Sequence, residues 1–429
     1  MPHRLVKKVF QKYGDWSAKA EANWNAQSGQ AWERLRQFSS IAAWNSQVRH
    51  LRARMRRIGR LMASRHYGQP DDFFFSFDEL PAMGKEYWFL HFVEPGTRRQ
   101  VVLTFGRAVS SVKVNATGVP APASSARAPS RAAGLLAAPA RLEAQAMAAS
   151  SRAGALLRHP RPLSPGQPLS MPCAAVCWLY GAKKEVLIDS SARVRIDGQG
   201  RLRSLTAASG KSSVLIEGTY PNYSARLVHN GRAVFSARIT PSAATPPYEF
   251  IHLLRSPILK GFGADMVNYY FKFRGTLQGR PAAGTAYLQK VLAVLPLAPW
   301  NWVRIQFASG AVLDFFTAKP LGPGPQSFQM ASNDYFEFNG RRHRLGGLTL
   351  HSWGFGERRR WTLAGPKLYL SMGSYALQPF AMKTKTRFQY DEYLVQVSDF
   401  ILQTDGQTFT LDDTGQGSGI VEEASGYLL

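Results

Sequence analysis

Four carboxylates beside aromatic residues are the side chains in this 429-residue sequence that are best suited to proton transfer. They lie in KGFGADMVNYYF, AVLDFF, ASNDYFEF and GIVEEASGY, as Asp265, Asp314, Asp334 and Glu422. A positioned carboxyl group can act as a general acid or base, alone or with a histidine, and the nearby histidines are His252, His343 and His351. We select Asp265 and Glu422 as candidate catalytic residues. Each of these side chains could instead cap a turn, face solvent on a strand or be a satisfied core group.

Other chemical motifs are missing from the sequence. It has no Ser/His/Asp nucleophile elbow, no P-loop and no strand-linked G-x-G-x-x-G. Cys173 and Cys177 form a C-x-x-x-C pattern without the second pair or the histidines that a zinc site requires. We interpret both as buried or reduced thiols, and we predict neither a metal nor a cofactor.

The elements that must position the carboxylates are predicted to be antiparallel strands. After Asp71, segments rich in aromatic and β-branched residues alternate with short turn signals. Asn-Gly and Asp-Gly supply the positive φ angles of a type I′ hairpin turn at little steric cost. The predicted turns are at Asp197-Gly198, Asn230-Gly231, Ser309-Gly310, Asn339-Gly340 and Asp405-Gly406. We therefore predict a mainly β protein with two β domains, at 71–280 and 281–429, divided near Arg280.

The segment from Gly284 to Phe316, GTAYLQKVLAVLPLAPWNWVRIQFASGAVLDFF, is predicted to begin the second β domain. Trp300 and Trp302 alternate with Asn301 and Val303, so both tryptophans face the same side of a strand. That side is either core or the wall of a ligand cavity, since both uses fall on the inner face of a β-barrel.

Basic residues are concentrated in two segments outside the predicted strands. Residues 1–70 contain 14 Lys and Arg against 3 Asp and Glu, and residues 107–170 contain 8 against 1, in a chain of net charge +25. The first segment has a helical apolar stripe flanked by Arg52, Arg56, Arg57 and Arg60. This helix could pack on the protein, lie on an anionic membrane or bind a polyanion. The second segment, rich in Ala, Pro, Ser and Arg, is predicted to be a disordered insert in the first β domain.

No membrane-spanning stretch and no secretory signal are predicted. The longest apolar run, Val291 to Trp300, is interrupted by Pro296 and Pro299 and is too short to cross a bilayer. The N-terminal residues lack the apolar region of a signal peptide. We therefore expect a cytoplasmic protein, with peripheral attachment to a membrane as a further hypothesis.

Four short motifs resemble the carotenoid 1,2-hydratase and AttH-like family. They are GTAY at Gly284–Tyr287, WNWVRIQF from Trp300, YDEYLVQV at Tyr390–Val397 and GQGSGIVEEASGY at Gly415–Tyr427. The resemblance implies two lipocalin-like barrels in tandem, an apolar cavity for an isoprenoid or other lipid, and in some members addition of water to a terminal C=C bond. The resemblance is that of a divergent member, because Gln289 and Lys290 stand where the family tends to have an acid and a histidine.

Our leading hypothesis is a protein that binds or carries a hydrophobic, isoprenoid-like or other lipid ligand. The candidate ligand-binding residues are Tyr269, Tyr287, Trp300 and Trp302, and the four arginines named above are the candidate membrane or anion contacts. The alternative is a hydratase or isomerase of the lyase type that uses Asp265 and Glu422. A second alternative is a nucleic-acid-binding or scaffold protein, and nucleic acid is disfavoured because basic and aromatic residues do not interleave.

Overall fold

The computed structural model describes residues 84–108, 112–115, 117–119, 169–199, 202–242, 248–252, 263–294, 299–319, 328–329, 334–383 and 387–426. They form antiparallel strands with one short α-helix and one 3₁₀ turn, which confirms the predicted mainly β fold. The predicted basic helix, its four arginines and most of the 107–170 insert lie outside the described residues. Among the described residues, no helix is long and apolar enough to cross a membrane.

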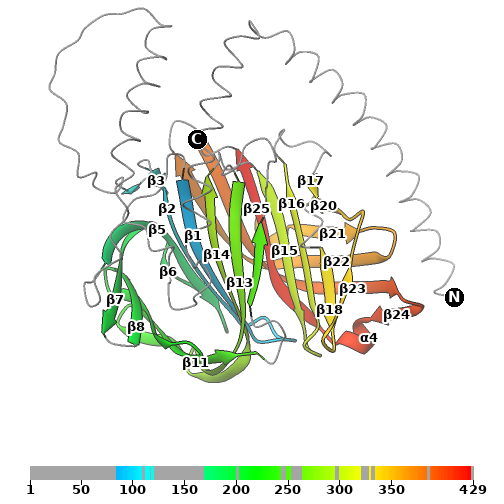
Figure 1. The fold of residues 1–429 in the computed structure, drawn as a ribbon, viewed down its shortest axis with the longest axis horizontal. Coiled ribbons are helices and arrows are strands. Elements are labelled where there is room, and N and C mark those ends of the chain that lie inside the picture. Colours follow the sequence, from blue (N-terminus) through cyan, green and yellow to red (C-terminus); the bar gives the residue numbers. More distant parts are fainter. Residues whose placement is uncertain are drawn as a thin grey trace, which may run out of the picture.

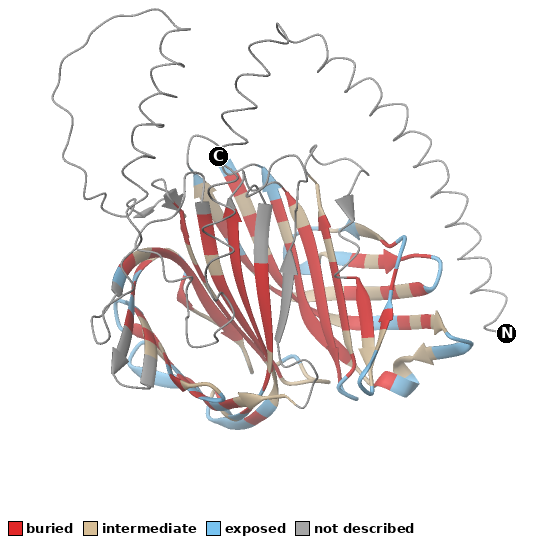
Figure 2. Cartoon of the chain, in the orientation of Figure 1, coloured by how far each residue is buried: buried red, intermediate tan, exposed pale blue. Residues whose placement is uncertain are grey.

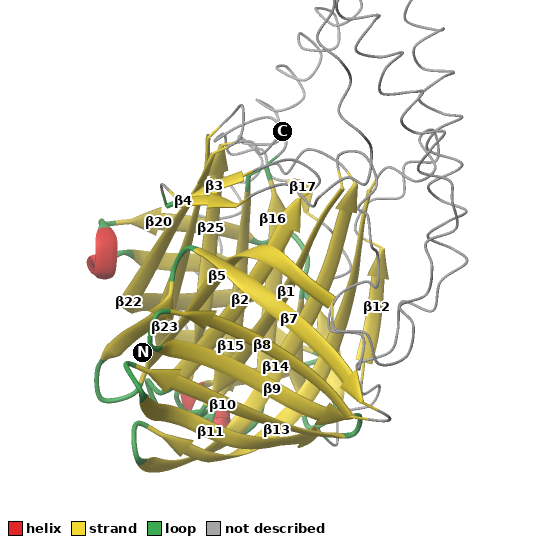
Figure 3. Cartoon of the chain, turned by 90° about the vertical axis from the view of Figure 1, so that its left-hand side faces the viewer, coloured by secondary structure: helices red, strands yellow, loops and turns green. Residues whose placement is uncertain are grey.

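Ten strands of the first sheet close into an antiparallel barrel (Figures 1 and 3). In ladder order they are β11 (Arg232–Pro241), β10 (Asn222–His229), β9 (Ser212–Thr219), β8 (Leu202–Ser209), β7 (Ser191–Gln199), β5 (Leu169–Tyr180), β2 (Gln100–Ala108), β1 (Gly84–Val93), β14 (Arg280–Val294) and β13 (Gly263–Leu277). Pairing of β13 with β11 closes the ring. Two more strands, β6 (Lys184–Ile188) and β12 (Tyr248–His252), pair with β5 and β13.

Large side chains of its own strands pack inside the barrel. Alternate residues of a strand face opposite sides, and the inward residues of β1 include Trp88 and Phe92. The ring centroid of Trp88 is 5.6 Å from that of Phe105, and that of Phe92 is 4.8 Å from that of Phe235. These rings occupy interior space that an open lipocalin-type barrel leaves to its ligand.

The second sheet contains the remaining strands. Its ladder order is β19 (Arg341–Arg344), β18 (Tyr335–Phe338), β16 (Val312–Ala318), β15 (Trp300–Phe307), β25 (Gly417–Gly426), β23 (Arg387–Thr404), β22 (Leu368–Lys383), β21 (Arg360–Ala364) and β20 (Thr349–Trp353). Four short strands attach to this path: β17 (Phe328–Gln329), β24 (Gln407–Thr410), β3 (Val112–Val114) and β4 (Thr117–Val119). The helix α4 (Leu411–Thr414) follows β24.

The prediction of a second barrel is not confirmed, because no ladder between described residues joins β19 to β20. Both edge strands are short, and β19 exposes Arg341 and Arg344. Charged side chains and short length are the usual means by which an edge strand avoids further pairing. The described residues therefore form one closed barrel and a second antiparallel sheet.

The strand topology places the change of sheet later than the division predicted near Arg280. Gln278 and Gly279 have φ angles of 50° and 76° and form a tight turn between β13 and β14. These two strands pair from Leu277 opposite Arg280 to Gly263 opposite Val294. The polar sequence around Arg280 is therefore a hairpin turn within the first sheet, and the chain passes to the second sheet between β14 and β15.

Part of the predicted disordered insert is ordered. Its first residue, Arg107, belongs to β2, and Val112–Val114 forms β3, which pairs with β22 of the second sheet. The Asn115 side chain donates a hydrogen bond to the Asp189 carbonyl oxygen at 2.6 Å and accepts one from the Ala381 amide at 2.8 Å. The β-branched residues of β3 and these two bonds explain why this part of the segment has a defined place.

Most of the predicted hairpin turns are confirmed. Both residues of Asn230-Gly231, Asn339-Gly340 and Asp405-Gly406 have positive φ, and Gly310 after Ser309 has a φ of 91°. The prediction of a turn at Asp197-Gly198 is wrong, because both residues lie within β7, opposite Ser204 and Arg203 of β8. The buried Val194, Ile196 and Leu205 set the register of this pair, and a shift of one residue would turn them toward solvent.

The outer face of the barrel packs on one face of the second sheet. An apolar cluster joins barrel residues such as Phe89, Trp178 and Tyr287 to Trp302 and Phe380 of the second sheet. The rings of Phe89 and Trp302 meet edge to face at 5.4 Å. Buried positions run along the strands that meet here (Figure 2). This contact brings residues far apart in the sequence into one buried layer.

Barrel closure depends on the absence of a side chain at Gly275. A Cβ atom at this position would lie 1.9 Å from the Ser236 carbonyl oxygen and 2.6 Å from the Ala237 Cα of β11. We expect Gly275→Ala to lower the free energy of unfolding by about 1–3 kcal/mol, because backbone must move at the closing ladder. Gly346→Ala is the control, since a Cβ there meets nothing within 4 Å. Equal urea midpoints for the two variants would contradict this role of Gly275.

Candidate active site

Two glutamates lie side by side in the layer between the sheets. Glu392 on β23 pairs directly with Glu422 on β25, so the two side chains share one face of the second sheet. Glu392 is fully buried and Glu422 is 6% exposed. Side chains directly opposite each other on antiparallel strands have Cβ atoms about 5 Å apart, and like charges in this arrangement repel. The pair is therefore poorly suited to holding two negative charges at once.

Hydrogen bonds from both sheets hold the carboxyl groups in place. Glu392 accepts from the Trp178 indole at 2.6 Å and from the Thr104 hydroxyl at 3.0 Å, and both donors are barrel residues. Glu422 accepts from the indole of Trp300 on the neighbouring β15 at 3.1 Å. The side chain of Tyr390, two residues before Glu392 on β23, lies close enough to both carboxyl groups to counteract part of the rise in their pKa values. Tyr390 thus stands beside both acids, and Glu392 links the sheets.

Burial changes the protonation of the pair. It raises the pKa of Glu392 to about 7 and that of Glu422 to about 8, with the negative charge of Glu392 as a further cause for Glu422. Strongly coupled groups lose their protons as a pair. At neutral pH the pair therefore retains a proton that an exposed carboxyl group would have lost. A general acid works best when its pKa lies close to the pH at which it acts, and the pKa values of this pair meet that condition at neutral pH.

Aromatic rings surround the pair. The ring of Trp300 lies 5.3 Å from Phe388 and 5.7 Å from Tyr390, measured between centroids. Tyr87 faces the pair from the barrel, and its pKa is raised by burial and by the negative charge of Glu422. The faces of such rings attract a positive charge. The surroundings suit an apolar molecule that passes through a cationic state.

A second polar cluster lies on the same layer, around a buried ion pair between Arg304 and Asp314. The Trp302 indole donates to Asp314 at 2.9 Å, and the Arg304 guanidinium lies 4.0 Å from the centroid of the Tyr287 ring. The Tyr287 hydroxyl donates to the Asn268 side chain at 2.6 Å and accepts from the Gln289 amide at 2.9 Å. This network fixes the side chains on which the two sheets meet.

The structure brings some predicted site residues together and separates others. Tyr287, Trp300 and Trp302 all lie in the layer between the sheets, whereas Tyr269 lies in the barrel interior. Asp265 occupies a position on β13 opposite Leu292 and His252, and its side chain is outside the description. Glu422 has Glu392 as its partner.

Glu392 is the site residue that sequence reasoning missed. It stands in YDEYLVQV between Tyr390 and Leu394, two residues that share its strand face. An acid in the middle of an apolar, alternating strand face was the available signal. Gln289 belongs to the Tyr287 network, while Lys290 is buried on the other side of β14, 5.4 Å from the centroid of the Tyr269 ring.

Of the other predicted acids and histidines, three interact with nearby residues, and for the remaining two the structure gives burial or a strand position. Asp314 pairs with Arg304, and Asp334 accepts a hydrogen bond from the Phe316 amide at 3.2 Å. Nδ1 of His343 lies 3.2 Å from the carboxylate oxygen Oδ2 of Asp405. His351 is half-buried on β20, and burial lowers its pKa. Of His252 only the strand position on β12 is described.

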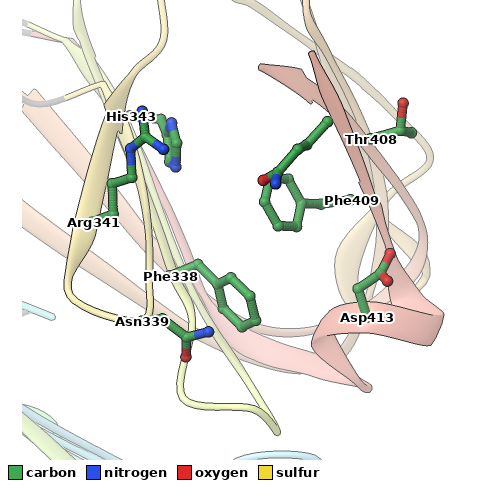
Figure 4. A pocket seen from close by; sticks show the side chains of 8 residues that line it. Phe338, Asn339, Arg341, His343, Thr408, Phe409 and Asp413 are labelled. Carbon is green, nitrogen blue, oxygen red and sulfur yellow. The ribbon is translucent and has the colours of Figure 1, made fainter. Parts of the chain in front are cut away.

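A separate groove of about 610 Å³ opens at the edge of the second sheet (Figure 4). Its walls come from the β18–β19 turn and from β24 and α4, and the rings of Phe338 and Phe409 from these two walls meet edge to face at 5.5 Å. The charged side chains of its wall have partners, since Arg341 pairs with Asp405 at 2.8 Å and Asp413 accepts from the Thr410 amide at 2.8 Å. We assign this groove no part in the chemistry.

Comparison with known protein families finds no match, and comparison with curated proteins finds none either. Among solved structures, the chain is similar to the crystal structure of CghA, with a TM-score of 0.39 and 11% identity over 83% of this chain and 97% of that one. CghA with Sch210972 gives a TM-score of 0.37 and 10% identity, with coverage of 83% and 97%. Kievitone hydratase from Nectria haematococca gives 0.34 and 10%, with coverage of 83% and 95%.

The glutamate pair predicts a stability that falls as the pH rises. A glutamate in the unfolded chain has a pKa near 4.5, whereas the pKa values of Glu392 and Glu422 in the folded protein are about 7 and about 8. Between pH 4.5 and pH 8 the native state therefore binds more protons than the unfolded state. Each extra bound proton lowers the free energy of unfolding by about 1.4 kcal/mol per pH unit. We expect this decline in urea titrations between pH 6.5 and 8.

The range from pH 6.5 to 8 is chosen because the buried His91 and Lys85 change their protonation mainly outside it. The pKa of His91 is lowered to about 3 by burial, so above its ordinary value of 6.5 it is neutral in both states. The pKa of Lys85 is lowered to about 8 by burial, so its opposing effect belongs to higher pH. The double variant Glu392→Gln with Glu422→Gln should have a flatter profile in this range. A profile identical to that of the wild type would show that the two groups ionise as they do in the unfolded chain.

Proposed function

We propose that this protein binds an apolar, unsaturated small molecule between its two sheets and that Glu422 delivers a proton to it. The observation that carries the proposal is the cross-strand pair of buried glutamates, whose raised pKa values keep a proton available at neutral pH. The aromatic setting of Trp300, Tyr390 and Tyr87 supports an isoprenoid-like ligand. The four sequence motifs that resemble carotenoid hydratases favour a C=C bond as the group that receives the proton.

The chemistry can be written with the residues present. The O–H bond of protonated Glu422 breaks as the π electrons of the alkene form a new C–H bond, which leaves a carbocation on the neighbouring carbon. The ring faces of Trp300 and Tyr390 stabilise that charge. A water molecule then adds its oxygen to the cation and gives a proton to ionised Glu392, for a net addition of H₂O. If Glu392 instead removes a proton from an adjacent carbon, the product is an isomer with a moved double bond.

Tyr390 completes the cycle in this proposal. After one turnover Glu422 is ionised and Glu392 is protonated. The Tyr390 side chain acts on the pKa of both groups, and in this proposal its hydroxyl accepts the proton from Glu392 while donating its own to Glu422. Such a transfer restores the starting state without opening the site to bulk water.

Binding or carriage of a hydrophobic ligand without chemistry is the other function that this site favours. The observation behind it is the same layer of aromatic side chains, taken without a catalytic role for the acids. Between the two, the raised pKa values favour the enzyme, because an apolar ligand gains nothing from an acid that retains its proton. The two functions differ in whether the bound molecule leaves changed.

We expect Glu422→Gln to lower turnover about 100-fold or more, because the amide keeps the size of the side chain but cannot give up a proton. The ligand should first be identified by native mass spectrometry of the purified protein with lipid extraction. Turnover of that molecule, or of an isoprenoid with a terminal C=C bond, is then followed by the mass of the product. Wild-type activity should fall as the pH rises through about 8, where Glu422 loses its proton.

Glu423→Gln is the matched control. The Glu423 side chain pairs with Arg359 at 2.8 Å and accepts from the Trp361 indole at 2.8 Å, away from the glutamate pair. We expect this variant to retain wild-type turnover. A wild-type protein that binds the ligand and yields no product would support carriage alone, and a fully active Glu422→Gln variant would remove Glu422 from the reaction.

A further inference from the structure

The turn between β20 and β21 exposes two large aromatic side chains. Trp353 is 48% exposed and Phe355 is 89% exposed, and among the described residues these are the exposed large hydrophobic side chains. They stand two residues apart in a turn that includes the 3₁₀ turn Gly356–Arg358. We name residues 352–360 the aromatic tip. Exposure of a whole phenylalanine ring to water is unfavourable relative to its burial.

Internal bonds hold the aromatic tip in this shape. The Arg359 side chain donates to the Gly354 carbonyl oxygen at 3.1 Å and to the Ser352 hydroxyl at 2.9 Å, and it pairs with Glu423 at 2.8 Å. Gly354 has a φ of 78°, and a Cβ there would lie 2.7 Å from the Arg358 carbonyl oxygen. Because the backbone is fixed in this way, Phe355 is held outward by the fold.

Positive charge borders the two rings. Arg358 and Arg360 are exposed on the aromatic tip, and the third arginine, Arg359, is neutralised by Glu423. The one acid of the tip, Glu357, lies close enough to Lys184 of β6 to favour the charged form of that lysine. The surface around the rings therefore attracts anions.

The size of the apolar surface argues against a protein partner. An aromatic side chain can bury about 150–250 Å², so the two together supply less than the roughly 800 Å² per partner of a stable protein interface. Two aromatic side chains bordered by arginines do suit the boundary of a bilayer, where rings lie among the lipid head groups and guanidinium groups bind phosphate.

We propose that the aromatic tip docks the protein on an anionic phospholipid bilayer, with Trp353 and Phe355 entering the head-group region and Arg358 and Arg360 binding phosphates. This inference goes beyond the proposed function and does not depend on it. It also differs from attachment through the basic N-terminal segment, because it places a particular turn of the second sheet at the lipid surface.

The test uses the full chain with an environment-sensitive fluorescent label on Glu357→Cys, which leaves both rings intact. The native Cys173 and Cys177 are buried in the barrel, so the label reacts at the new residue. Lys211→Cys, at an exposed turn of the barrel, is the control position. Vesicles of phosphatidylcholine alone are compared with vesicles that also contain phosphatidylserine, and bound protein is measured by co-sedimentation.

We expect a blue shift at position 357 and none at position 211, and only with the anionic vesicles. Phe355→Ser should weaken vesicle binding about tenfold, which corresponds to about 1.4 kcal/mol. Arg358→Ser with Arg360→Ser should remove the dependence on phosphatidylserine. Vesicle binding without a shift at position 357 would assign attachment to another surface and overturn the proposal. No binding at all, or a shift that grows with protein concentration in the absence of vesicles, would also overturn it.

Discussion

Burial of two acids against each other is the constraint on which the arrangement of this molecule depends. A carboxylate removed from water needs compensating hydrogen bonds or must keep its proton. Here both solutions occur: Glu392 accepts bonds from Trp178 and Thr104 of the barrel, and the pKa values of Glu392 and Glu422 are raised. Since the donors to Glu392 belong to the other sheet, its carboxyl group is satisfied only when the sheets are docked.

The closed barrel supplies the rigid half of this arrangement. Thr104 lies on β2 and Trp178 lies on β5, two neighbouring strands in the middle of the barrel's ladder order. The barrel closes where β13 pairs with β11. The second sheet supplies the acids from two of its central strands, β23 and β25, rather than from an edge. Sites built on paired strands hold their side chains more firmly than sites on loops. In the ladder order of the described residues, β19 and β20 lie at the two ends, so neither acid stands on an edge strand.

The fold class could be predicted from the sequence because hairpin turns are local. Asn230-Gly231, Asn339-Gly340 and Asp405-Gly406 each need positive φ within two residues, and nothing distant alters that need. The error at Asp197-Gly198 arose where the apolar alternation of Val194 and Ile196 outweighed a turn signal. The change of sheet was placed too early because Gln278-Gly279 is a turn of the same kind with a less typical first residue. Whether the second sheet closes depends on pairing between β19 and β20, which follow each other in the sequence, and the turn signals do not report that pairing.

The site could be predicted only in part, for a related reason. Glu422 was selected as a carboxylate beside aromatic residues in one motif, yet its cross-strand partner Glu392 lies 30 positions earlier and meets it only through the β23–β25 register. Gln289 and Lys290 were taken as a sign of divergence because the resemblance leads to an acid and a histidine at these positions. In the folded chain Gln289 orients Tyr287 by a hydrogen bond, and the acids come from two other strands. Residues that face a common layer can exchange roles without sharing a segment, so the register of the strands decides which acid can act.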